Sequence, residues 1–247
     1  MGGEKVRLSK RLSELDLCSR REGDRLISKG LVLVDGKVVN TLGEKVYRHQ
    51  RVELVEAGKR IQSKRRTILL NKPVGFVSHS DDNKFYSNAT SLLLPENFWP
   101  KLDTQTNNFM LDRKGFAPAG RLDIESTGML VLTQDGTVAK RLIGADNSIE
   151  KEYLVKVKGQ LTENGMDALR NGRIVLYGKP LKKADVRWQN EDQLRFVLKE
   201  GKKRQIRKMC ELVGLSVLQL QRVRIGRVSL GKLPLGHWRF LRNHERF

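Results

Sequence analysis

The sequence is poor in acidic residues relative to basic ones. Its 28 Asp and Glu residues face 48 Lys and Arg residues, so the formal net charge is +20. A field of this sign attracts polyanions and gives no advantage in binding neutral small molecules. Nucleic acid is therefore the expected partner. The alternative is a basic protein, for example a ribosome-bound one, whose charge serves only solubility or packing.

Cysteines and long apolar runs are also scarce. Cys18 and Cys210 belong to different predicted segments, which argues against a disulfide or a thiolate metal site, so we expect reduced thiols. The four histidines lack the spacing of metal ligands. No run of about 18 apolar residues and no apolar leader is present, so we expect a cytoplasmic protein that does not enter membranes. Nothing in the sequence demands an oligomer, and we expect a monomer.

Two short helices with basic surfaces are predicted near the N-terminus. Leucines at helical spacing over residues 8–15 predict the first helix, and Ser19 with Glu22 forms a capping box that predicts the second. Cations cluster on the exposed turns with few acids between them, which favours phosphate contact over a merely solvated face. The cations that we expect to bind RNA here are Lys10, Arg20, Arg21 and Arg25.

A hairpin is predicted after these helices, because Asp35-Gly36 separates two apolar runs. The segment VRLSKRLSELDLCSRREGDRLISKGLVLVDGKVV resembles the S4 RNA-binding domain, a family whose two-helix face packs against structured RNA. Residues 57–66, AGKRIQSKRR, are polar and basic without an apolar period, so we expect a flexible linker. We therefore expect an S4-like domain over residues 1–62 and a larger domain over residues 67–247.

The segment GRLDIESTGMLVLTQDG, residues 120–136, carries the strongest signal for chemistry. Asp123 follows Arg121 on a loop bracketed by glycines, and the apolar residues 129–133 predict a buried strand that ends in an Asp135-Gly136 turn. A carboxylate on a loop braced by core structure suits acid, base or nucleophile chemistry. Spacing alone does not decide this, because an Asp before a strand is more often a loop former or an ion-pair partner.

Other segments complete the larger domain. TILLNKPVGFVS predicts a strand that ends at Pro73, and KEYLVKV predicts a half-buried strand from Tyr153 onward. EGKKRQIRKMCELVG, residues 200–214, predicts a helix with one apolar face, a basic entrance and a stop at Gly214; a solvated basic face is the alternative. Residues 79–119 are irregular, and the sequence leaves their role open, although we expect Trp99 to cap the domain.

Four segments of the chain, in their order, are similar to the pseudouridine synthases of the RsuA/RluB/RluE/RluF branch. They are LNKPVGFVS, GRLDIESTGMLVLTQDG, KEYLVKV and EGKKRQIRKMCELVG. The resemblance covers nearly the whole chain apart from the irregular stretch, and the tail RVRIGRVSLGKLPLGHWRFL is most similar to RluF-like members. Alternating strands with few helices suggest an α+β fold. The resemblance implies a small S4-like αβ module followed by a catalytic domain with a mixed, largely antiparallel sheet and a central cleft.

The resemblance also implies roles for single residues. Asp123 would be the essential catalytic aspartate, Tyr153 would stack on the target uracil, and Arg207 would be the cation paired with the aspartate. Lys72 and Arg121 would support the active-site loops or touch the RNA backbone. The residues of this domain that we expect to contact RNA are Arg121, Lys72, Lys203 and Arg204.

The implied reaction is an isomerisation in which the N1–C1′ bond of uridine breaks, the uracil turns, and C5 bonds to C1′. No electron or group enters or leaves, so we expect no cofactor and no metal. Asp123 would attack C1′ or remove the C2′ proton, and the sequence leaves both routes open. We expect a ribosomal RNA substrate, with the large subunit favoured. The alternatives are a transfer RNA substrate and a non-catalytic ribosome-assembly factor.

Overall fold

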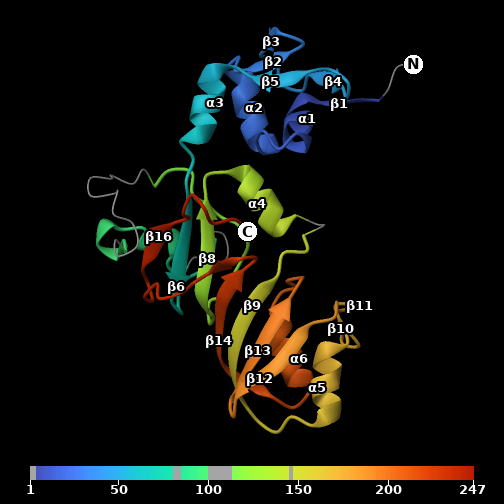
Figure 1. The fold of residues 1–247 in the computed structure, drawn as a ribbon, viewed down its shortest axis with the longest axis vertical. Helices are drawn as coiled ribbons and strands as arrows, with labels where there is room; N and C mark the ends of the chain where they lie inside the picture. The colour runs from blue at the N-terminus through green and yellow to red at the C-terminus, as the bar shows by residue number, and fades with distance from the viewer. Residues whose placement is uncertain (1–3, 80–84, 100–112, 145–146) are drawn as a thin grey trace. The chain divides into compact units, whose positions relative to one another are not determined.

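The computed structural model describes residues 4–79, 85–99, 113–144 and 147–247 (Figure 1). The chain forms two compact units. One comprises Met1–Thr67 with Thr133–Arg141, and the other comprises Ile68–Leu132 with Leu142–Phe247. No helix within the described residues is long and apolar enough to cross a membrane.

The N-terminal unit contains both predicted helices, α1 at Leu8–Glu14 and α2 at Arg20–Ser28. Leucines of both helices are buried in one core with residues of the neighbouring strands. The predicted capping box is confirmed, because the Ser19 hydroxyl accepts from the Glu22 N–H and the Glu22 carboxylate accepts from the Ser19 N–H. Each end of this exchange satisfies a main-chain donor that the helix leaves unpaired.

The predicted hairpin is confirmed as β2, Val32–Val34, paired with β3, Lys37–Val39. Asp35 and Gly36 have φ angles of 48° and 79°, as a two-residue turn of the type I′ class requires. A third strand, β5, Val52–Leu54, pairs with β2 on the side away from β3. A second small sheet pairs β1, Lys5–Arg7, with β4, Lys45–Tyr47.

The predicted flexible linker is wrong over most of its length, because Glu56–Ser63 forms helix α3. Its residues are mostly good helix formers. Gly58 is its one buried residue, and a Cβ there would lie 3.2 Å from the Leu31 carbonyl oxygen. The helix therefore packs on its unit through a close approach of the main chain at Gly58, and not through the stripe of apolar residues that a surface helix usually buries.

The chain after β8 also departs from the prediction. Gly136 does not complete a tight turn but begins helix α4, Gly136–Ile143, and the Asp135 carboxylate accepts from the Thr137 N–H at 2.8 Å. Within the N-terminal unit, the Glu22 carboxylate accepts from the Gly136 N–H at 3.1 Å and pairs with Arg65. Residues Thr133–Arg141 therefore belong to this unit, although their sequence position lies within the predicted larger domain.

Within the described residues, the larger unit is built on a nine-stranded sheet with the order β12-β13-β9-β14-β8-β6-β16, where β15 pairs with β14 and β7 with β8. Its strands are β6 Thr67–Lys72, β7 Ala117–Pro118, β8 Thr127–Thr133, β9 Lys151–Lys158, β12 Asp185–Asn190, β13 Gln193–Leu198, β14 Ser216–Ile225, β15 Val228–Ser229 and β16 Trp238–Phe240. β14 runs parallel to β8, whereas β9 is antiparallel to both β13 and β14. The predicted mixed, largely antiparallel sheet is confirmed.

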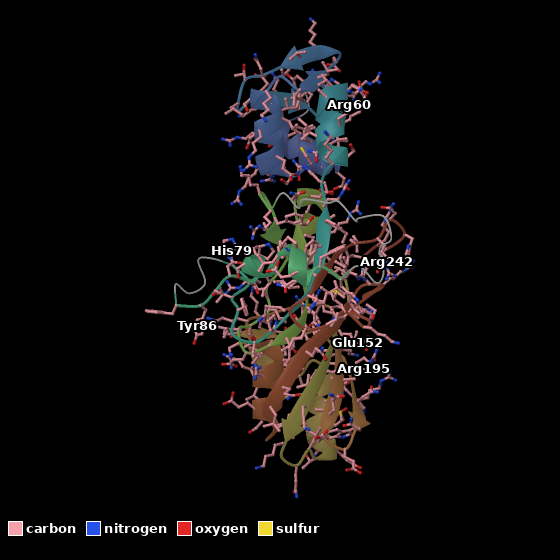
Figure 2. The ribbon with its side chains drawn as sticks, turned by 90° about the vertical axis from the view of Figure 1, so that its left-hand side faces the viewer. Arg60, His79, Tyr86, Glu152, Arg195 and Arg242 are labelled. Carbon is pink, nitrogen blue, oxygen red and sulfur yellow. The ribbon has the colours of Figure 1, made fainter. Side chains whose placement is uncertain are left out.

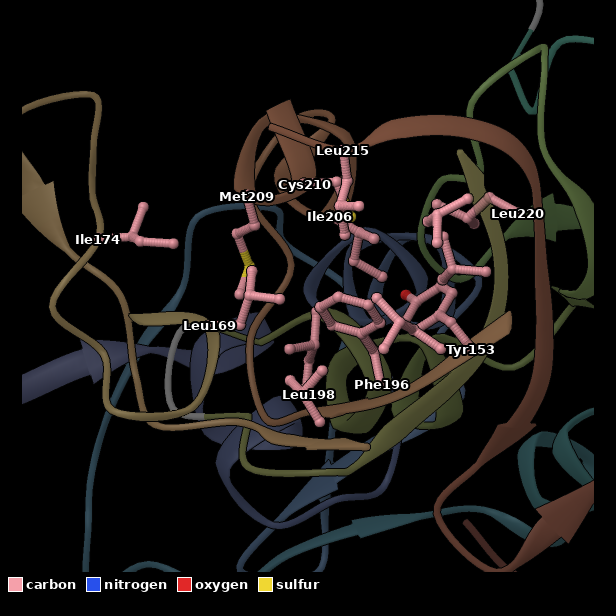
Figure 3. Packing of buried hydrophobic residues seen from close by; sticks show 14 of the residues in the cluster. Tyr153, Leu169, Ile174, Phe196, Leu198, Ile206, Met209, Cys210, Leu215 and Leu220 are labelled. Carbon is pink, nitrogen blue, oxygen red and sulfur yellow. The ribbon is translucent and has the colours of Figure 1, made fainter. Parts of the chain in front are cut away.

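Two helices, α5 at Glu163–Arg170 and α6 at Gln205–Leu212, pack against this sheet through a buried cluster (Figure 3). The predicted apolar face of α6 is confirmed, since Ile206, Met209 and Cys210 are buried. The helix ends before Gly214, whose φ is 81°. A separate hairpin pairs β10, Val175–Leu176, with β11, Lys179–Pro180.

The irregular stretch is described only in part, and residues 80–84 and 100–112 lie outside the described residues. Two 3-10 turns, Ala89–Leu92 and Pro95–Asn97, precede Phe98. The Phe98 ring packs on Trp238 with a centroid distance of 4.8 Å, while the Trp99 N–H donates to the Trp238 carbonyl. Of the neighbours Phe98 and Trp99, Phe98 therefore packs its ring on the core. A capping role for the Trp99 ring stays a prediction.

The two cysteine thiols are free and buried. Burial raises the pKa of Cys18 to about 11 and that of Cys210 to about 12. Both side chains therefore stay protonated and act as small apolar groups in the cores.

Candidate active site

Asp123 lies on a loop that hydrogen bonds hold on both sides. The Ser78 hydroxyl accepts from the Leu122 N–H at 2.9 Å and donates to the Leu122 carbonyl at 2.8 Å. The Gly75 N–H donates to the Ile124 carbonyl at 3.0 Å. Because both neighbours of Asp123 are fixed, the loop can hold a reacting group in one position.

Lys72 supports the same loops from the protein interior. Its side chain has 0% exposure. Its ammonium donates to the main-chain carbonyls of Pro73 at 2.8 Å, Phe76 at 3.0 Å and Ile124 at 3.5 Å. Burial lowers the pKa of Lys72 from 10.5 to about 8, while the charge of Asp123 opposes this lowering and that of Arg222 adds to it. Since Lys72 has no exposed surface, of its two expected roles only loop support fits this structure.

Asp123 lines a cavity of about 700 Å³ in the larger unit, and its wall also contains Tyr153 and Arg207. Among the charged residues described on this wall, only Asp123 and Glu200 are acidic. Within the described residues, the Asp123 carboxylate accepts no hydrogen bond and forms no ion pair; Lys72 is its electrostatic partner. The cavity therefore presents one uncommitted carboxylate in a basic surrounding, which suits a polyanionic substrate.

Tyr153 is placed by the alternation of β9, in which it shares the buried face with Val155 and Val157. It faces Phe196 on β13 and Arg222 on β14 in the sheet register. Its ring lies beside Phe196 in Figure 3, and Leu220 belongs to the same buried cluster. A ring packed on one side and lining the cavity on the other can receive a planar base.

The strand that carries Tyr153 is fixed to its neighbours by a carboxylate. Glu152 accepts from Arg195 at 2.7 Å and from Arg224 at 2.6 Å, and Figure 2 shows Glu152 and Arg195 side by side. Burial acts to raise the pKa of Glu152, but the hydrogen bonds from the two guanidinium groups outweigh it, so the pKa is lowered. The pairing ties β9 to β13 and β14 next to the candidate stacking residue.

In this structure Arg207 contacts Glu125, and the expected ion pair between Arg207 and Asp123 stays a prediction. The Arg207 Nε lies 3.5 Å from a carboxylate oxygen of Glu125, and Nη2 donates to the Glu125 carbonyl at 3.2 Å. Arg204 pairs with the same carboxylate at 3.1 Å. Glu125 lies two residues beyond Asp123 on the same loop. Its carboxylate, and not that of Asp123, therefore pairs with the two arginines at the start of α6.

Arg222 on β14 is a site residue that the sequence analysis missed. It is 4% exposed, its Nε donates to the Met129 carbonyl at 2.7 Å, and its Nη1 donates to the Arg121 carbonyl at 3.2 Å. Its Nη2 is buried without a hydrogen-bond partner in the part of the chain that the structure describes. The sequence carried a signal for this residue. Leu220 and Arg222 are two positions apart in a strand and so share its buried face, where a cation needs hydrogen-bond partners.

The residues expected to contact RNA fall in both units. In the N-terminal unit Arg20, Arg21 and Arg25 are exposed, whereas Lys10 is half-buried and lies 3.8 Å from Glu14. In the larger unit three expected RNA contacts line the cavity: Arg121, Lys203 and Arg204. RNA binding by these side chains stays a prediction. Over the described ranges, no group of three His, Cys, Asp or Glu side chains could hold a metal ion.

Comparison with known proteins gives two matching families along the chain. Residues 66–212 match the RNA pseudouridylate synthase family, and residues 6–52 match the S4 domain. The chain is 36% identical to the dual-specificity RNA pseudouridine synthase RluF of Escherichia coli strain K12 over 97% of the chain and 77% of that protein. It is 33% identical to ribosomal large subunit pseudouridine synthase B of Pseudomonas aeruginosa over 98% of the chain and 61% of that protein. A crystal structure of a pseudouridylate synthase aligns with a TM-score of 0.63 and 26% identity, covering 96% of each chain.

Proposed function

The chain belongs to the RNA pseudouridylate synthase family and carries an S4 domain, and from this premise we propose that it converts a uridine of large-subunit ribosomal RNA to pseudouridine. The observation that carries the proposal is Asp123, an uncommitted carboxylate on a fixed loop in a basic cavity. The Pseudomonas aeruginosa relative is a ribosomal large subunit pseudouridine synthase, which supports the choice of ribosomal RNA. The exposed cations of α2 would bind phosphates of the same RNA.

In the proposed mechanism the substrate uridine leaves its stack and enters the cavity. Asp123 attacks C1′ or removes the C2′ proton, and in both routes the N1–C1′ bond breaks. The uracil turns and C5 bonds to C1′; this step releases the Asp123 carboxylate from C1′ in the first route and returns the proton to C2′ in the second. The C5 proton is then lost as N1 gains one. Tyr153 stacks on the detached base, which keeps it in the cavity during the turn. Lys72, through its three carbonyl contacts, keeps the two loops together.

Release of tritium from RNA that contains 5-tritiated uridine tests the proposal, because the reaction replaces the C5–H bond by the C5–C1′ bond. Mapping pseudouridine in RNA from cells that lack the protein then identifies the substrate. A missing modification in large-subunit ribosomal RNA supports the proposal. No tritium release and no missing modification would leave a non-catalytic ribosome-assembly factor.

A transfer RNA substrate is the second candidate, because an S4-type domain reads the shape of folded RNA and not a simple base code. A missing pseudouridine in transfer RNA, alone or beside one in ribosomal RNA, would support it. For the setting of the reaction we propose a monomer acting in the cytoplasm.

We propose that Arg207 leaves Glu125 and turns to Asp123 when RNA is bound, since both line one cavity. Arg207→Ala is then expected to lower kcat by about a hundredfold, as for loss of a charge-stabilising donor. Glu125→Gln removes the partner that holds Arg207 in the present structure and is expected to change kcat by less than about threefold. Tritium-release rates of the two variants decide the point. Equal losses would show that the pair with Glu125 is itself what the reaction needs.

The low pKa of Lys72 predicts a pH dependence. As the pH rises through about 8, Lys72 loses its proton and with it the positive charge that interacts with Asp123, so kcat is expected to fall. Unfolding does not explain such a fall. The pKa of Lys72 is lower in the folded chain than in the unfolded chain. At pH values between these two pKa values, the unfolded chain therefore binds more protons. In that range the contribution of Lys72 to the free energy of unfolding rises with pH.

The measurement is the pH profile of kcat for the wild type and two variants. Lys72→Met should have a low rate without this fall near pH 8. Lys151→Met is the matched control, because Lys151 lines the cavity that holds Asp123 and burial also lowers its pKa; it should keep the fall. A fall that persists in Lys72→Met would belong to another group.

A further inference from the structure

The hairpin of β10 and β11 has a turn residue that does not suit its backbone. Tyr177 and Gly178 join the strands with φ angles of 57° and 71°. At the first position of such a two-residue turn, Asn, Asp and Gly are favoured. The chain follows this preference at Asp35-Gly36, where the φ angles are 48° and 79°. A bulky residue with positive φ is strained, and such strain is tolerated where the side chain has a function.

The surrounding structure holds the Tyr177 ring in place without burying it. The Tyr177 hydroxyl donates to the Lys203 carbonyl at 2.9 Å, and the Lys208 Nζ lies 4.3 Å from the ring centroid. The residue is nevertheless 57% exposed. Packing does not explain a strained aromatic residue whose ring is both fixed and open to solvent.

The hairpin is attached to the wall of the catalytic cavity. Lys202 lines the cavity and donates from Nζ to three hairpin carbonyls, those of Leu176 at 3.5 Å, Lys179 at 3.1 Å and Pro180 at 3.2 Å. Lys203, which accepts from the Tyr177 hydroxyl, lines the same wall. Residues 171–183 contain four basic residues and no acidic one. The exposed ring therefore lies next to the cavity in a basic surrounding.

We infer that Tyr177 is a stacking platform for an RNA base next to the target uridine. The inference rests on the proposed function and adds a contact outside the catalytic residues. Flipping a uridine leaves its neighbours without a stacking partner. A fixed aromatic ring beside cations can replace that partner, since the ring takes the base and the cations take the phosphates. Lys208, whose Nζ lies over the ring, and Lys203, whose carbonyl accepts from the Tyr177 hydroxyl, are two such cations.

Two substitutions at position 177 separate stacking from a structural role. Tyr177→Asn removes the ring and suits the turn, so the melting temperature should rise while kcat/KM on RNA falls about tenfold, mainly through KM. Tyr177→Phe keeps the ring and loses only the hydroxyl, so kcat/KM should stay within about threefold of the wild type. Trp188→Ala is the matched control, because Trp188 is 41% exposed and does not line the cavity; it should leave kcat/KM unchanged.

The assay is tritium release from 5-tritiated uridine RNA taken from cells that lack the protein. Wild-type kcat/KM in Tyr177→Asn would overturn the inference. Equal losses in Tyr177→Asn and Tyr177→Phe would also overturn it, because the role would then belong to the hydroxyl that holds Lys203. Absence of conversion by the wild type would instead overturn the proposed function and, with it, the stacking role.

Discussion

Asp123→Asn is expected to abolish the conversion of uridine, lowering kcat by about a thousandfold or more. The amide can neither attack C1′ nor accept the C2′ proton. It has the shape of the carboxylate, so the loop bonds of Ser78 and Gly75 should remain and the variant should fold. Binding of RNA should not weaken, because the substitution removes a negative charge from a basic cavity, and the affinity should change by less than about threefold.

Tritium release measures the turnover of this variant, and filter binding with the same RNA measures its affinity. Glu125→Gln is the matched control, because it removes a carboxylate from the same loop two residues away. A control that keeps its rate assigns the loss to position 123 and not to loop charge. Turnover by Asp123→Asn above about a tenth of the wild-type rate would contradict the catalytic assignment.

Gly128→Ala is expected to lower the free energy of unfolding of the larger unit by about 3 kcal/mol or more. Gly128 pairs with Arg222 across the parallel strands β8 and β14 and has a φ of 103°. A Cβ there would lie 2.3 Å from the Arg222 carbonyl oxygen and 2.6 Å from its nitrogen. Both contacts are to sheet main chain, so relief requires the strands to separate. That separation would displace Arg222 from the cavity and lower activity as well.

The control is Gly236→Ala, because Gly236 also has a positive φ, 78°, but a Cβ there would meet nothing within 4 Å. It should cost only about 1 to 2 kcal/mol, the strain of the backbone itself. Urea unfolding followed by tryptophan fluorescence measures both, since all three tryptophans belong to the larger unit. Equal losses in the two variants would show that the contact with Arg222 is not the cause.

Local chemistry let the sequence predict much of the fold. The Ser19 and Glu22 capping box and the Asp35-Gly36 turn depend on residues within four positions of each other, and both form as expected. The apolar face of α6 follows from helical period alone. Asp123 was identified by a specific motif, and the structure places it on the wall of the cavity that Tyr153 also lines.

The sequence by itself thus determined the family, the main strands, the two N-terminal helices and the loop that carries Asp123, because these depend on short-range periodicity and motif. Only the tertiary structure decided the partner of Arg207, the buried position of Arg222 and the place of residues Thr133–Arg141. Long cationic side chains have several carboxylates and carbonyls within reach. Which of these they meet depends on the register of strands and loops far apart in the sequence, and no local pattern encodes that register.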